Sequence, residues 1–186
     1  MLASGSPRRL ALLTQIGLTP SQVVVTDVDE TPLAKETPRA LALRLALAKA
    51  EAGLGLAAGS VVLGADTVVA CGARALPKAE EETQARACLS LLSGRAHQVI
   101  TAVAVARPGL ATLSRTVVTR VSFKRLTPAE IEAYLASEEW CGKAGGYAIQ
   151  GLAGRFVTGL NGSYTAVVGL PLYETANLLA AAGVRA

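Results

Sequence analysis

Ser60–Cys71, with the sequence Ser-Val-Val-Leu-Gly-Ala-Asp-Thr-Val-Val-Ala-Cys, is an apolar segment with a carboxylate at its centre. Its flanks are apolar and mostly β-branched, which is typical of a strand buried on both faces. Asp66 interrupts them, and an aspartate is rarely buried unless it is paired, hydrogen-bonded or bound to a metal. Two interpretations follow. Asp66 either caps a turn between two short strands, or it lies at the end of a rigid strand and points into a cleft.

The composition predicts a well-packed globular protein of one domain, residues 1–186, which could also form two lobes on a shared core. Hydrophobic residues make up 51% of the chain and charged residues 17%, which argues against disorder. The net charge of +4 is not concentrated in a Lys/Arg block. We therefore expect no nucleic-acid partner, and a pocket for a small polyanion instead.

The three cysteines and the single histidine give little support to a zinc site or a disulfide framework. Cys71, Cys88 and Cys141 form no C-x-x-C motif, so a reducing cytoplasm is the expected location. His97 is expected to be a polar strand residue. No signal peptide is recognisable near Met1, and charged residues interrupt the longest apolar stretch, so we expect no membrane partner.

The first predicted helix, residues 7–16, begins after Ser6 with Pro7 at its first position. Arg8 and Arg9 therefore lie in its first turn, where the helix dipole disfavours cations. An anion bound at that turn would explain them, since the free N–H groups there also attract anions. The alternative is a pair of solvated arginines on a surface helix.

A second, long helix is predicted from Thr37 to Gly53. Its expected inner face consists of four residues at helical spacing: Leu41, Leu45, Ala48 and Ala52. Lys49 lies at the edge of this stripe, where its long side chain can reach a cleft.

The remaining segments alternate between strands and helices. We expect a strand over 22–26, a hairpin of strands 97–107 and 112–124, helices over 80–92, 127–136 and 171–182, and either a strand or a helical turn over 164–169. Three glycines in the segment 143–151 suggest a loop whose backbone closely approaches another group.

Polar side chains recur at the ends of these predicted elements. Several are cations and a few are carboxylates: Ser4, Ser6, Arg8, Arg9, Glu30, Lys49, Asp66, Lys78, Lys143 and Gln150. Arg and Lys hold phosphate oxygens, and Asp and Glu hold Mg²⁺ or Mn²⁺. This inventory suits a nucleoside triphosphate with a divalent cation. No Walker motif, dinucleotide-binding glycine motif or G-x-S-x-G is present.

Several blocks resemble the Maf family of nucleotide pyrophosphatases. They are Leu2–Arg9, Gly64–Thr67, Ser93–Val103, Lys143–Gly151 and Asn161–Leu172. The resemblance implies an α/β fold with an elongated mixed sheet, helices on its faces and a central cleft between two lobes, similar to the inosine-triphosphate pyrophosphatases. It also implies hydrolysis of a nucleoside triphosphate to the monophosphate and pyrophosphate with a divalent metal cation, and a possible homodimer.

The resemblance also implies roles for individual residues. Asp66 would be the proton acceptor or would bind the metal, with Glu30 as a second acidic metal position. Arg8, Thr67 and Gln150 correspond to positions linked to substrate choice. Four further residues correspond to phosphate-contacting positions: Ser4, Arg9, Lys49 and Lys78.

The amide of Gln150 favours dTTP or UTP as the substrate. It presents one donor and one acceptor, which complement O4 and N3–H of uracil or thymine. Modified pyrimidine triphosphates fit the same edge. The alternatives are 7-methyl-GTP as the substrate, or a non-catalytic nucleotide-binding regulator of septum formation and cell division. Two departures from the family pattern are Pro77-Lys78-Ala79 in place of Gly-Lys-Pro and Gly142 in place of an acid.

Overall fold

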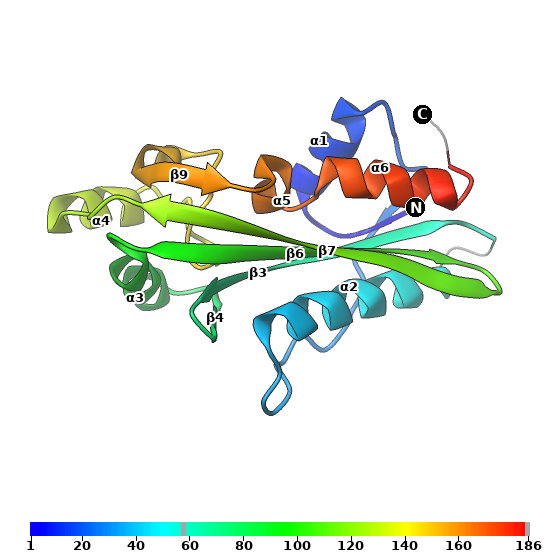
Figure 1. The fold of residues 1–186 in the computed structure, drawn as a ribbon, viewed down its shortest axis with the longest axis horizontal. Coiled ribbons are helices and arrows are strands. Elements are labelled where there is room, and N and C mark those ends of the chain that lie inside the picture. Colours follow the sequence, from blue (N-terminus) through cyan, green and yellow to red (C-terminus); the bar gives the residue numbers. More distant parts are fainter. Residues whose placement is uncertain (57–58, 185–186) are drawn as a thin grey trace.

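The computed structural model describes residues 1–56 and 59–184. Its centre is a mixed sheet with the strand order β2-β1-β3-β6-β7-β9, and β4 pairs with β3 (Figure 1). β1 is parallel to β2 and β3, whereas the remaining neighbours pair antiparallel. The strands of this sheet are β1 Leu2–Ala3, β2 Val23–Val24, β3 Val62–Cys71, β4 Arg74–Leu76, β6 Ala96–Arg107, β7 Leu110–Phe123 and β9 Val157–Asn161.

Asp66 lies in the middle of β3, which runs without interruption from Val62 to Cys71. The turn interpretation is therefore wrong, and so is the placement of Asp66 at a strand end. β6 pairs with β3 from Val62 to Ala70, and this continuous ladder outweighs the turn preference of Gly64 and Asp66.

The helices begin close to the capping residues in the sequence. They are α1 Pro7–Gln15, α2 Pro38–Leu54, α3 Glu82–Leu92, α4 Pro128–Leu135, α5 Tyr164–Val168 and α6 Leu172–Ala181, with a 3₁₀ helix, η1, at Leu152–Phe156. Thr37 accepts a hydrogen bond from the Ala40 N–H at 3.2 Å, as an N-cap should. Ser6 has the extended backbone of an N-cap, but its side chain forms no capping bond. The segment 164–169 is a helical turn rather than a strand.

Two helical layers cover opposite faces of one end of the sheet (Figure 1). α2 covers one face, where Leu45 packs with Val62 and Ile100. α1 and α6 cover the other, where Leu13 packs with Val103. A third apolar cluster lies under α3, α4 and η1 at the far end of the sheet, and its members include Leu89, Tyr134 and Phe156. The predicted α/β fold, with two lobes on one elongated mixed sheet, is confirmed.

The inner face of α2 differs from the predicted stripe. Leu41 and Leu45 are buried as expected, but Ala48 is only half-buried and Ala52 is exposed. Lys49 takes the next inward position, with 8% of its surface exposed. Leu41, Leu45 and Lys49 are four residues apart, so they follow one face of the helix. Burial of a lysine charge is costly, and here two carboxylates compensate that cost.

A second, two-stranded pair joins distant parts of the chain. β5 (Lys78–Ala79) pairs antiparallel with β8 (Lys143–Ala144). This pairing brings the glycine-rich segment against the segment that carries Lys78.

His97 is a buried polar strand residue, as predicted, with 2% of its surface exposed. The three cysteines are free thiols, and they range from the buried Cys88 to the exposed Cys141. Within residues 1–56 and 59–184, no helix is both long and apolar enough to cross a membrane.

Candidate functional site

Along one edge of β3, the strand pairing has a gap at the centre of the strand. On this edge, β1 pairs with Leu63 and Gly64, and β4 pairs with the strand from Val69 onward. No described strand pairs with the stretch between them. Asp66 and Thr67 lie in this gap and point to opposite faces of the sheet, because strand residues alternate. Both nevertheless line the same cavity, which has a volume of about 250 Å³.

Lys49 links the two carboxylates of the site. Its Nζ lies 2.7 Å from Oδ1 of Asp66 and 2.6 Å from Oε1 of Glu30. Asp66 is only 4% exposed, so its charge requires a buried partner. Lys78 forms an ion pair with the other oxygen of Glu30. Burial raises the pKa of Glu30, but the hydrogen bonds from Lys49 and Lys78 outweigh burial and lower this pKa to about 2. Glu30 is therefore ionised at neutral pH.

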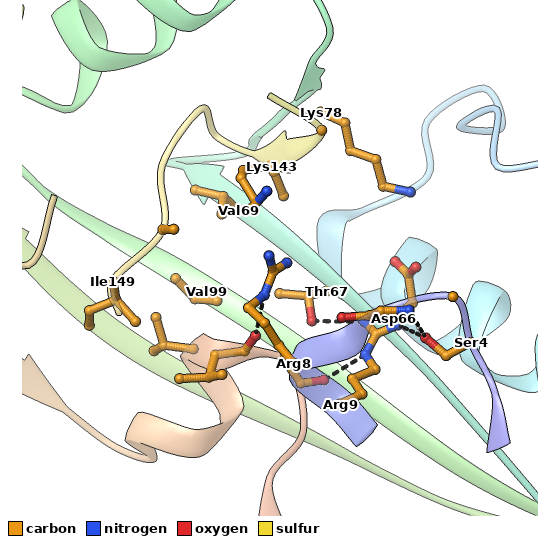
Figure 2. A pocket seen from close by; sticks show the side chains of 18 of the residues that line it. Ser4, Arg8, Arg9, Asp66, Thr67, Val69, Lys78, Val99, Lys143 and Ile149 are labelled. Carbon is orange, nitrogen blue, oxygen red and sulfur yellow. Dashed lines mark hydrogen bonds between the residues drawn. The ribbon is translucent and has the colours of Figure 1, made fainter. Parts of the chain in front are cut away.

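Arg9 is held rigidly by three acceptors (Figure 2). Its Nε donates to the Gly169 carbonyl at 2.8 Å, Nη1 to Ser4 Oγ at 3.1 Å and Nη2 to Thr67 Oγ1 at 3.3 Å. A guanidinium carries five N–H groups, so two stay available for a ligand. Burial lowers the pKa of Arg9, while the charge of Asp66 opposes this change. The result is a fixed, charged fork facing the cavity.

Arg8 and Lys143 point toward one another from opposite sides of the cavity (Figure 2). Arg8 Nε makes a long bond of 3.4 Å to the Val168 carbonyl, and its terminal nitrogens have no acceptor among the described residues. Lys143 Nζ donates to the Cys141 carbonyl at 2.9 Å and forms no ion pair in the described part of the chain. Burial, and then the charge of Arg8, lower the pKa of Lys143. Two cations that repel each other across a cavity favour an anion between them.

The segment that carries Gln150 is anchored by two tyrosine hydroxyls. Tyr134 accepts a hydrogen bond from the Ala148 N–H at 3.2 Å. The hydroxyl of Tyr147 lies 2.8 Å from Nε2 of His97. Gln150 itself is exposed and lines the cavity. Its amide is therefore free for a ligand, while the backbone on its N-terminal side is fixed.

Gly145 and Gly146 confirm the predicted close backbone approach in this segment. Both have a φ of +68°, which favours glycine. A Cβ on Gly145 would lie 2.8 Å from Val69 Cγ1, and one on Gly146 would lie 3.1 Å from Ala85 Cα.

All nine residues selected from the sequence line this one cavity. They are Ser4, Arg8, Arg9, Glu30, Lys49, Asp66, Thr67, Lys78 and Gln150. Lys143 also lines it and was named among the polar residues without a role. Sequence reasoning missed Thr101, whose hydroxyl lies 3.0 Å from that of Thr67, and Arg44, which donates to the Thr31 carbonyl in the loop that carries Glu30. It also missed the carbonyls of residues 168 and 169, which accept from Arg8 and Arg9. Backbone carbonyls leave no trace in a sequence, and nothing distinguishes Thr101 from other strand threonines.

The two carboxylates fit the way proteins bind Mg²⁺ or Mn²⁺ in nucleotide sites. Asp66 and Glu30 both contact the Lys49 ammonium, so an oxygen of each already converges on one positive charge. The described residues contain no group of three or more His, Cys, Asp or Glu side chains that could enclose a metal. Mg²⁺ commonly uses one or two carboxylates and takes its other ligands from water and phosphate. The donor set therefore suits a cation shared with a substrate.

Comparison with known proteins identifies close relatives over the whole chain. A family model described as "Maf-like protein" matches residues 1–182. The dTTP/UTP pyrophosphatase of Caulobacter vibrioides is 59% identical over 185 residues, covering 100% of this chain and 96% of the relative. The protein of the same name from Hyphomonas neptunium is 62% identical, with the same coverage. Among solved structures, the Staphylococcus aureus Ham1 protein aligns with a TM-score of 0.47 and 16% identity, over 66% of this chain and 70% of that one.

Proposed function

Because this chain belongs to the Maf-like protein family, we propose that it is a nucleoside triphosphate pyrophosphatase that hydrolyses dTTP and UTP to the monophosphate and pyrophosphate. The observation that carries the proposal is the set of charges at the gap in the sheet. Buried Asp66 and half-buried Glu30 lie beside Lys49, and the fixed fork of Arg9 faces the same cavity. Relatives with the name dTTP/UTP pyrophosphatase at 59% and 62% identity support the same conclusion.

The cations of the cavity bind the triphosphate. Arg9 offers two N–H groups in a planar fork, and Lys49 and Lys78 act as point charges. Both lysines are paired with Glu30 in the structure, so an incoming triphosphate competes with that carboxylate for them. Ser4 supports Arg9 through its hydroxyl.

Asp66 is the residue to which we assign activation of the attacking water. Its Oδ1 contacts Lys49, and its Oδ2 has no hydrogen-bond partner among the described residues, so it can accept a water proton. A divalent cation held by Asp66 and Glu30 would neutralise phosphate charge and lower the pKa of a bound water. Lys49 keeps the two carboxylates together until the substrate arrives.

Gln150, Arg8 and Thr67 are proposed to select the base and orient the nucleotide. The exposed amide of Gln150 can pair with O4 and N3–H of uracil or thymine. Arg8 brings a second donor group to the same cavity. A substrate that lacks the complementary edge leaves these groups unpaired, which lowers its reactivity.

We further propose that residues 1–186 form one domain, since residues from Ala3 to Gly169 line the same cavity. We also propose that the protein lies in the cytoplasm. The three free thiols support a reducing compartment. The family resemblance supports a possible homodimer, which analytical ultracentrifugation tests directly.

The decisive experiment is a pyrophosphate-release screen over nucleoside triphosphates with Mg²⁺ and with Mn²⁺. We expect dTTP and UTP to be turned over at least about 10-fold faster than 7-methyl-GTP. Asp66→Asn is expected to reduce pyrophosphate release by about 10²- to 10⁴-fold while nucleotide binding is retained, because the amide keeps the shape but not the basicity. Full activity in this variant would refute the assignment of Asp66. Binding by the wild-type protein without turnover would favour the non-catalytic regulator.

A further inference from the structure

Thr101 is a fully buried hydroxyl residue behind the cavity, on β6 directly opposite Thr67 of β3. Its Oγ1 lies 3.0 Å from Oγ1 of Thr67 and 2.7 Å from the carbonyl oxygen of Ala166. Thr67 Oγ1 in turn accepts a hydrogen bond from Arg9 Nη2 at 3.3 Å. These contacts form a continuous chain of hydrogen bonds from the guanidinium of Arg9 to the backbone of α5.

Proton counting fixes the direction of this chain. A hydroxyl group has one proton and two lone pairs. The Ala166 carbonyl can only accept, so the proton of Thr101 is directed to it. The bond between the two threonines must then use the proton of Thr67. Thr67 therefore turns only lone pairs toward Arg9 and the cavity.

The C-terminal end of α5 explains why the hydrogen bonds of the two threonines keep this direction. The last carbonyls of a helix lack partners within the helix and carry partial negative charge. Around α5, the Ala166 carbonyl receives Thr101, the Val168 carbonyl receives Arg8, and the Gly169 carbonyl receives Arg9. One short helix end thus positions both arginines and sets the direction of the threonine pair.

We infer that Thr101 is a positioning residue: by giving its proton to the Ala166 carbonyl, it makes the Thr67 oxygen a hydrogen-bond acceptor that orients Arg9 for phosphate binding. This inference rests on the proposed function, because it assigns Arg9 to the polyphosphate. It also narrows what Thr67 can contact. With its proton turned away, Thr67 can receive an N–H or O–H group of a ligand but cannot donate to a phosphate oxygen.

Binding of inorganic tripolyphosphate, measured by titration calorimetry, tests the inference without turnover. Thr101→Val keeps the shape of the side chain and removes the hydroxyl, so Thr67 loses its acceptor. We expect the dissociation constant to rise about 3- to 10-fold, the effect of one neutral hydrogen bond. Thr101→Ser retains the hydroxyl and is expected to stay within about 2-fold of the wild type.

Thr119→Val is the matched control. Thr119 is also fully buried and also donates to a carbonyl next to α5, that of Ser163 at 3.2 Å, but it makes no hydrogen bond to Thr67 or Arg9. We expect this variant to lose a similar amount of thermal stability while binding tripolyphosphate as the wild type does. An equal loss of binding in Thr119→Val would reduce the effect to general destabilisation and overturn the inference.

A double-mutant cycle separates positioning from packing. Thr67→Val breaks the chain one step closer to Arg9, so adding Thr101→Val should then weaken binding no further. Additive effects, or unchanged binding in Thr101→Val alone, would overturn the inference.

If the wild-type protein binds tripolyphosphate and follows this pattern but hydrolyses no nucleotide, the proposed reaction fails while the role of Thr101 stands. If it hydrolyses dTTP and the pattern is absent, the role of Thr101 fails while the proposed reaction stands.

Discussion

Arg44 connects the loop that carries Glu30 to helix α2. Its Nε lies 2.7 Å from Glu36 Oε1, and its Nη2 donates to Glu36 Oε2 at 2.9 Å and to the Thr31 carbonyl at 3.0 Å. The loop lies between β2 and α2 and contains no helix or strand of its own. Glu30 therefore reaches Lys49 from a segment that one arginine fixes to the helix carrying Lys49.

Arg44→Gln is expected to loosen this loop and weaken substrate turnover. The loss of charge-assisted bonds at a half-exposed site leaves Glu30 beside Lys49 for a smaller fraction of time. We expect kcat/KM for dTTP to fall about 3- to 10-fold, which corresponds to about 1 kcal/mol. Steady-state kinetics measure the change. Arg39→Gln on the same helix is the control, since Arg39 is exposed and its side chain makes no hydrogen bond or ion pair among the described residues. Equal kinetics in the two variants would contradict the role of Arg44.

At the scale of elements, the contact between β3 and α2 depends on the absence of a side chain at Gly64. A Cβ there would lie 2.5 Å from the Ala46 carbonyl oxygen and 2.6 Å from the Ala50 nitrogen. Both are backbone atoms of α2, so the helix lies directly on the strand. This close approach sets how far Lys49 on α2 stands from Asp66 on β3.

Gly64→Ala is expected to push α2 away from the sheet. Overpacking of this kind costs about 1–3 kcal/mol of stability, and the Lys49–Asp66 ion pair should lengthen with it. We predict a lower melting temperature and a loss of activity larger than the fraction unfolded explains. Thermal denaturation and pyrophosphate release test the two parts. Gly159→Ala in β9 is the control, because a Cβ there has no neighbour within 4 Å.

Local signals predicted the elements of the chain well and their faces less well. The helices predicted from Thr37 and over 127–136 both form, the first capped by Thr37 and the second by a capping box of Thr127 and Glu130. The predicted hairpin forms as β6 and β7. These signals act through nearby backbone groups. The burial of Lys49 and the continuity of β3 through Asp66 depend instead on partners far away in the sequence. For the same reason, the candidate site was predicted from residue types and from the family resemblance, while its gap between β1 and β4 could not be foreseen.

At the scale of the whole molecule, His97 makes the stability of the lobe around α3, α4 and η1 depend on pH. It is buried against Phe123 and Tyr147, and its Nδ1 has no partner in the described part of the chain. Tyr147 is the titratable group that contacts it. Burial lowers the pKa of His97 from 6.5 to about 4. The unfolded chain therefore binds a proton more readily than the folded protein, so stability is highest above pH 6.5 and falls as the pH drops toward 4.

We predict a loss of about 2–3 kcal/mol between pH 6.5 and pH 4.5 from this group. The pKa of Glu30 is lowered to about 2, so the contribution of Glu30 is lost only below about pH 4.5. The two pH windows are therefore separate. Urea unfolding at a series of pH values should show the decline in the wild-type protein and a flatter profile in His97→Gln. Identical profiles would show that His97 does not control the acid sensitivity of this lobe.

The carbonyls that hold Arg8 and Arg9 come from residues about 160 positions later in the chain. Arg8, Arg9 and Thr67 are synthesised before the C-terminal end of α5, which holds the two arginines in place. An unfinished chain therefore carries most of the charged groups without their final geometry. The arginine positions seen in the folded protein can therefore form only after the segment around Gly169 has been synthesised.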